Sequence, residues 1–220
     1  MKCPYRFGVP RLAAFLAVLA ACACLTGCFG FLKPAHENAR HFVLTPLPAA
    51  GQVTSTPAAP AVGVGRVKLP AYLFDTSLAV RKDSNEIEYL PLALWAERLD
   101  SGIQRVLAAN FATLLPTERV RLSTWRSEDV TAEVYVTFEQ FDVDTRGRGV
   151  LVAWWRVLSP GGEKTLKAGE SRLSLQGPAP GTNAPGAVAT LSNLLAEQSR
   201  QLTQAITEAT RARLAQPVSQ

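Results

Sequence analysis

Cysteine and histidine are scarce in this chain and are confined to its N-terminal part. The four cysteines are Cys3, Cys22, Cys24 and Cys28, and the two histidines are His36 and His41. From residue 42 onward the chain therefore has no thiol or imidazole for a disulfide, a nucleophilic pair or a metal site. It also has no nucleophile elbow, no glycine-rich phosphate loop and no cluster with metal-ligand spacing. These absences predict a protein that is not an enzyme and holds no cofactor or metal.

Negative charge is absent from the first 36 residues. Lys2, Arg6 and Arg11 form a basic head, and an apolar run of about a dozen residues follows at 12–23. That run is shorter than the roughly 20 residues that cross a bilayer, but it suits the apolar region of a signal peptide. The next segment, Leu25-Thr26-Gly27-Cys28, resembles the lipobox of bacterial lipoproteins. An ordinary secretory signal or a buried helix are the alternatives.

The lipobox resemblance implies cleavage before Cys28 and a lipid on its thiol. Several acyl chains together anchor a protein stably to a membrane. Phe29 follows, whereas an Asp at that place retains lipoproteins in the inner membrane of enteric bacteria, so we expect the outer membrane and its periplasmic face. Removing the three basic residues of the signal leaves 20 basic and 18 acidic residues, so the net charge gives no reason to expect nucleic acid. The sequence has no second long apolar run, so we expect no transmembrane helix.

The sequence predicts a signal peptide at 1–27, a tether at 28–39, one domain at 40–214 and a tail at 215–220. Alternating apolar residues predict strands in the domain, and apolar spacings of three, four and seven predict helices. The predicted strands are 40–45, 62–69, 78–82, 86–90, 119–124, 131–143, 150–158 and 165–175, and the predicted helices are 92–115 and 187–214. We expect a single α+β domain in which two amphipathic helices pack on a largely antiparallel or mixed sheet of about five to six strands.

Two pairs of side chains are candidate partner contacts. Trp154 and Trp155 are neighbours on a predicted strand and must point to opposite faces, so one can cover the helices while the other is either covered or an exposed interface anchor. Arg146 and Arg148 flank a glycine in a predicted turn, where they are either solvated or in contact with an acidic partner or lipid headgroup.

Glu133 and Glu139 share one face of a predicted strand. At about 3.3 Å per residue they lie nearly 20 Å apart, which is too far for a catalytic carboxylate pair. We expect both carboxylates to face water.

Three short motifs between residues 67 and 99 carry a family resemblance. They are Leu69-Pro70-Ala71-Tyr72-Leu73, Ala79-Val80-Arg81 and Trp95-Ala96-Glu97-Arg98-Leu99. Together they resemble the ABC-type transport auxiliary lipoproteins, which include the paraquat-inducible (Pqi-type) outer-membrane lipoprotein that partners MCE (mammalian cell entry) proteins. Arg98 stands where that family often has proline.

The resemblance implies a periplasmic accessory subunit that docks an MCE-type lipid transporter at the outer membrane. Its implied partners are the membrane, through the lipid anchor, and an MCE-domain protein. Assembly into a homo-oligomeric ring and binding of a phospholipid are left open. Two alternatives are a lipid carrier with a cavity between sheet and helices, and a structural lipoprotein that binds peptidoglycan. The motif residues Leu69, Pro70, Tyr72, Leu73, Trp95, Glu97 and Leu99 have structural explanations, so no catalytic role is carried over to them.

Overall fold

The computed structural model describes residues 38–49, 59–115 and 117–215. The predicted signal peptide, Cys28, His36 and most of the tether lie outside these residues, as does nearly all of the predicted tail. The chain divides into two compact units, residues 1–38 and 39–220, and every described strand and helix belongs to the second unit.

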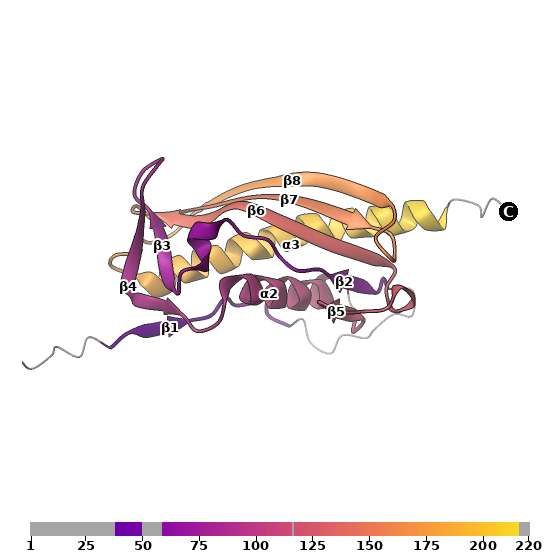
Figure 1. The fold of residues 1–220 in the computed structure, drawn as a ribbon, viewed down its shortest axis with the longest axis horizontal. Coiled ribbons are helices and arrows are strands. Elements are labelled where there is room, and N and C mark those ends of the chain that lie inside the picture. The colour runs from indigo at the N-terminus through magenta and orange to yellow at the C-terminus, as the bar shows by residue number, and fades with distance from the viewer. Residues whose placement is uncertain (1–37, 50–58, 116, 216–220) are drawn as a thin grey trace, which may run out of the picture. The chain divides into compact units, whose positions relative to one another are not determined.

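The second unit is built on one mixed sheet (Figure 1). Its eight strands are β1 (Arg40–Phe42), β2 (Val62–Val64), β3 (Ser77–Arg81), β4 (Ile87–Trp95), β5 (Val120–Leu122), β6 (Ala132–Asp144), β7 (Arg148–Leu158) and β8 (Thr165–Gln176). The α+β fold class is confirmed, but the expected five to six strands were too few, because every segment predicted as a strand joins the sheet.

The long strands β6, β7 and β8 pair in antiparallel order, so that β7 is central and β8 pairs only with β7 among the described strands. The other side of β6 pairs in parallel with β2 and with β3. Strand β4 joins β3 to β1, and β5 lies beside β2. Strand β8 has more polar residues than β7, which is compatible with a position at the edge of the sheet.

Two helices complete the unit, α2 (Leu99–Leu114) and α3 (Ala184–Leu214). The predicted helix at 92–115 began too early, because residues 92–95 continue β4. Pro91 lies where the β3–β4 register shifts, and such an irregularity tolerates a proline inside a strand. At the start of α3, the side chain of Asn183 accepts a hydrogen bond from the Gly186 amide at 2.9 Å, which caps the helix.

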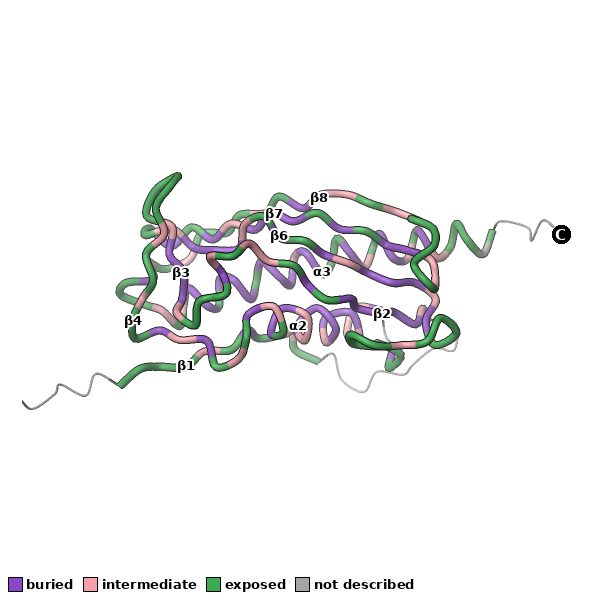
Figure 2. Tube along the Cα trace, viewed as in Figure 1, coloured by how far each residue is buried: buried purple, intermediate pink, exposed green. Residues whose placement is uncertain are grey.

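Helix α3 packs along one face of β6, β7 and β8, and α2 packs beside α3 (Figure 1). Figure 2 shows buried residues along the sides of these elements that face one another. The largest fully buried side chains include Phe111 on α2, Phe141 on β6, Leu151 on β7 and Leu195 on α3. Neither helix of the described part of the chain has the length and apolarity that a membrane span requires.

Candidate functional site

The face of β6 and β7 that points away from α3 carries most of the exposed aromatic and charged side chains of these strands. We call it the outer face; it includes Tyr135, Thr137 and Glu139 on β6 and Trp154 and Arg156 on β7. Trp154 is 49% exposed, which is unusual for so large an apolar side chain. Trp155 points to the helix side, is 9% exposed, and lies against Gly169 of β8. The two tryptophans thus occupy opposite faces, as strand alternation predicts.

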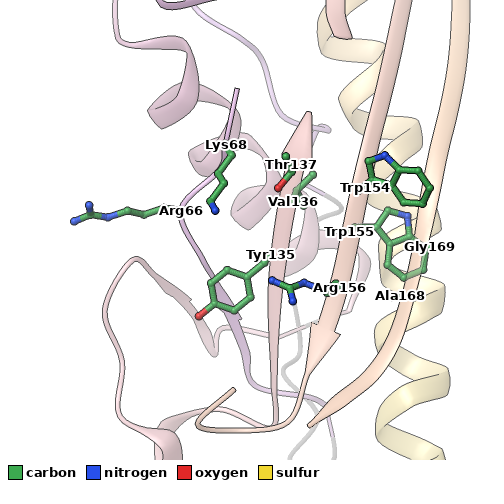
Figure 3. Close-up of a pocket in the computed structure, with 10 residues that line it drawn as sticks. All are labelled: Arg66, Lys68, Tyr135, Val136, Thr137, Trp154, Trp155, Arg156, Ala168 and Gly169. Carbon is green, nitrogen blue, oxygen red and sulfur yellow. The ribbon is translucent and has the colours of Figure 1, made fainter. Parts of the chain in front are cut away.

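A pocket of about 710 Å³ opens on the outer face (Figure 3). We call it the outer pocket. Its charged and aromatic lining residues are Arg66, Lys68, Tyr135, Trp154, Trp155 and Arg156. Figure 3 shows the side chains of Lys68 and Arg156 pointing toward Tyr135, while Arg66 extends away from them. The segment after β2, the middle of β6 and the middle of β7 therefore build one site.

Main-chain hydrogen bonds fix the segment that carries the first two cations. The Gly65 amide donates to the Val134 carbonyl at 2.9 Å, and the Lys68 amide donates to the Val136 carbonyl at 3.1 Å. The Lys68 carbonyl in turn accepts from the Phe138 amide at 2.9 Å. A Cβ atom at Gly65 would lie 2.4 Å from the Tyr135 ring, so glycine allows this ring to lie against the backbone.

Two carboxylates outside the pocket lining orient the Tyr135 and Trp154 rings. Trp154 donates its indole N–H to Glu139 at 2.7 Å, and the Tyr135 hydroxyl donates to Glu133 at 3.2 Å. Burial, followed by the charge of Glu133, raises the pKa of Tyr135 above its usual value. Tyr135 therefore keeps its proton, and its ring keeps this orientation, at neutral pH.

The expectation that Glu133 faces water was wrong. Its side chain is buried, and its carboxylate accepts hydrogen bonds from the Trp125 indole at 3.1 Å and the Gly161 amide at 2.8 Å as well as from Tyr135. The loop that contains Trp125 and the turn at Gly161 bring these donors to it, which the pattern of one strand cannot reveal. Glu139 is exposed, as expected.

The outer pocket is electropositive. Arg66, Lys68 and Arg156 line it, and no carboxylate does so. None of these three cations forms an ion pair with any residue that the structure describes. Within the same described ranges, no group of histidine, cysteine, aspartate and glutamate residues could hold a metal ion. The site can therefore attract an anion.

Arg146 and Arg148 lie at the β6–β7 turn, away from the outer pocket. Both are exposed, and their amides donate to the Asp144 carboxylate at 2.8 and 2.9 Å. Arg148 and Trp154 are six positions apart along β7, which is about 20 Å at 3.3 Å per residue. The structure does not bring the two predicted contact pairs together. His41 is exposed on β1.

The family model described as the ABC-type transport auxiliary lipoprotein component matches residues 42–215. The chain belongs to this family. Two solved structures are similar to this auxiliary lipoprotein in fold. One is an uncharacterised protein with 20% identity and a TM-score of 0.64; the match covers 77% of this chain and 99% of that protein. The other is a Xanthomonas campestris protein of the DUF330 family with 12% identity and a TM-score of 0.65; the match covers 81% of this chain and 100% of that protein. No curated protein matches the sequence.

In this auxiliary lipoprotein the recognised motif residues lie mainly in the core or brace it. Leu73, Trp95 and Leu99 are buried, and Leu69 packs partly buried against the same core. Pro70 precedes the short 3₁₀ helix η2 (Ala71–Phe74). Two further motif residues form polar contacts: Tyr72 donates a hydrogen bond to Asp142, and Glu97 forms an ion pair with Arg105 at 2.5 Å.

Of the pocket residues, sequence reasoning selected only the two tryptophans. It missed Arg66, Lys68, Tyr135 and Arg156, which come from three separated segments. One usable signal was present: a glycine inside a predicted strand either weakens the strand or marks a close approach to its backbone, and the rings of Trp125 and Tyr135 lie against Gly63 and Gly65.

Proposed function

We propose that this auxiliary lipoprotein is a lipid-anchored periplasmic subunit that docks an MCE-type lipid transporter at the outer membrane. The observation that carries the proposal is the family match, which spans nearly all of the folded domain. The predicted acylation of Cys28 supplies the anchor. Fully extended at about 3.3 Å per residue, a predicted tether of residues 29–39 would reach roughly 35 Å, which is enough for the domain to stand clear of the membrane surface.

Confinement at one surface strengthens weak contacts between the domain and its partner. Binding to a transporter that reaches the same membrane becomes effectively intramolecular, so modest contact areas suffice. Trp154 is a suitable anchor for such a contact, because it is half exposed and its ring is held by Glu139 before any partner arrives. In this proposal the domain acts by binding rather than by catalysis.

The packed interior favours docking over an internal lipid carrier. A carrier of the kind considered from the sequence needs an apolar cavity between sheet and helices. That space contains large, fully buried side chains, including Phe111, Ile103 and Leu107 from α2 and Leu195 and Ile206 from α3. The outer pocket lies on the opposite face of the sheet.

Crosslinking in cells tests the docking proposal. The full chain would carry the photoreactive residue p-benzoylphenylalanine in place of Trp154, with Cys28 intact. We expect capture of an MCE-domain protein. The matched control places the same residue at Leu122, which is 44% exposed on β5 and does not line the outer pocket. Capture of no transporter subunit from position 154, in acylated and folded protein, would overturn the proposal.

The β6–β7 turn is tested separately. Replacing Arg146 and Arg148 with glutamate reverses both charges, and we expect weaker capture from position 154 if the turn touches an acidic surface. Unchanged capture at moderate salt would show that the turn is only solvated and would leave Trp154 as the proposed anchor.

A further inference from the structure

The outer pocket gathers positive charge that the described domain does not neutralise. Most other cations on the long strands and helices have an acidic neighbour, such as Lys167 with Glu208 or Arg172 with Glu170. Lys68 and Arg156 form no ion pair with any residue that the structure describes, and both side chains point toward the Tyr135 ring (Figure 3). Like charges held in one pocket repel each other, and a bound anion removes that repulsion.

The pocket is also built in advance. Lys68 is fixed at its backbone by hydrogen bonds to Val136 and Phe138, and Arg156 lies within the β6–β7–β8 ladder. Glu133 and Glu139 hold the Tyr135 and Trp154 rings from outside the pocket lining. An anionic ligand therefore meets a site whose walls need little ordering.

From these observations we infer that the outer pocket binds the phosphate ester of an anionic phospholipid headgroup. The guanidinium of Arg156 matches the geometry of two phosphate oxygens, and Lys68 adds a compact point charge. A volume of about 710 Å³ falls within the usual range for small-molecule sites, of order 300–1,000 Å³. The Trp154 ring and the small residues Ala168 and Gly169 offer an apolar wall for the glycerol portion.

The same lining gives a preference among headgroups. No carboxylate lines the pocket, so nothing there neutralises the ammonium of a zwitterionic headgroup, and the neighbouring cations repel it. A glycerol headgroup carries no such charge. The pocket therefore favours phosphatidylglycerol over phosphatidylcholine. The acyl chains remain outside, where a membrane or a docked partner can receive them.

Native mass spectrometry of the acylated full chain, released in a nonionic detergent, tests this inference without any transporter. We expect one added phosphatidylglycerol per chain, at a half-saturating concentration at least 5-fold lower than for phosphatidylcholine. The variant Lys68→Glu/Arg156→Glu should weaken phosphatidylglycerol binding at least 10-fold. The milder Lys68→Gln/Arg156→Gln should weaken it in the same direction and serves if charge reversal prevents folding.

The control Arg121→Glu/Arg211→Glu makes the same change in net charge at exposed positions on β5 and α3, and it should bind like the wild type. Equal loss in this control would overturn the pocket assignment, as would unchanged binding in both pocket variants. Glycerol phosphate without acyl chains is the third probe; if it bound as tightly as the lipid, a soluble phosphate ester would replace the lipid as ligand. A negative result leaves the docking proposal intact, because docking is read by protein capture.

Discussion

The hydroxyl of Tyr72 donates a hydrogen bond to the carboxylate of Asp142 at 2.8 Å, and this contact ties the segment after β2 to strand β6 of the sheet. The same carboxylate forms an ion pair with Arg81 at 2.7 Å and accepts from Gln140 at 2.8 Å. Its side chain is only 1% exposed. A buried carboxylate is tolerated when its oxygens are paired in this way, so η2, β3 and β6 are held together by one charged cluster.

Replacing Tyr72 with phenylalanine removes one of these donors and leaves the buried carboxylate less satisfied. We expect the free energy of unfolding to fall by about 1–3 kcal/mol, measured by urea denaturation. Tyr89 is the matched control, because its hydroxyl donates to the Tyr72 carbonyl at an exposed position. Tyr89→Phe should cost no more than about 0.5 kcal/mol. Equal losses in the two variants would contradict a special role for Asp142.

The same cluster predicts a loss of stability in alkali. Burial, followed by the charge of Asp142, raises the pKa of Tyr72 well above the usual value of tyrosine. Above about pH 10 the unfolded chain releases this proton while the folded chain keeps it, so the free energy of unfolding falls as pH rises. Tyr72→Phe lacks this proton. The stability gap between wild type and variant should therefore be smaller at pH 11 than at pH 9, and an unchanged gap would refute the link. Tyr135 is present in both proteins, so its contribution to the pH dependence cancels in this comparison.

The sequence predicted the fold class because the long strands and both helices carry strong periodic patterns. Its clearest error was at 92–95, where an apolar run after Pro91 fitted a helix that begins with proline. A local irregularity between β3 and β4 accommodates that proline instead, and the run ends in Trp95 of β4. Such pairing depends on residues distant in the sequence, so no local pattern reveals it.

The site was harder to predict than the fold. Trp154 was found because alternation along one strand forces it away from Trp155. Lys68 and Arg156 were not, because 88 positions separate them and only the parallel packing of the segment after β2 against β6 brings them together. Burial of Glu133 was missed for the same reason, since its donors come from two loops.

Arg98 departs from the proline of the family motif, and the structure predicts that proline is tolerated there. The backbone φ of Arg98 is −57°, which lies within the range that the proline ring allows. Within the described residues its N–H has no acceptor. Arg98→Pro loses an ion pair with Asp100 that solvent screens, and it also stiffens the unfolded chain, which offsets that small loss. The net change in the free energy of unfolding should stay within about 1 kcal/mol of zero.

Arg98→Ala loses the ion pair without stiffening the chain, so denaturant unfolding should find it less stable than Arg98→Pro. A loss above about 2 kcal/mol in the proline variant would mean that the backbone at the start of α2 cannot accept the ring.

Gly169 and Trp155 face each other across β8 and β7, and their packing predicts a strong effect of one methyl group. A Cβ at Gly169 would lie 2.5 Å from the Trp155 ring, so Gly169→Ala must displace the ring and should cost about 1–3 kcal/mol. Gly181→Ala is the control, since a Cβ there meets nothing within 4 Å. Denaturation curves should show a change of about 0.5 kcal/mol or less for it.

A second substitution separates ring displacement from loss of strand flexibility. The indole N–H of Trp155 is buried and has no acceptor in the described part of the chain, so Trp155→Phe removes an unsatisfied donor together with part of the ring. The smaller ring leaves room for the Gly169 methyl group, and the double variant should therefore lose less stability than the two single losses added together. Strict additivity in the denaturation data would show that the cost of Gly169→Ala arises in the backbone of β8 and not from contact with Trp155.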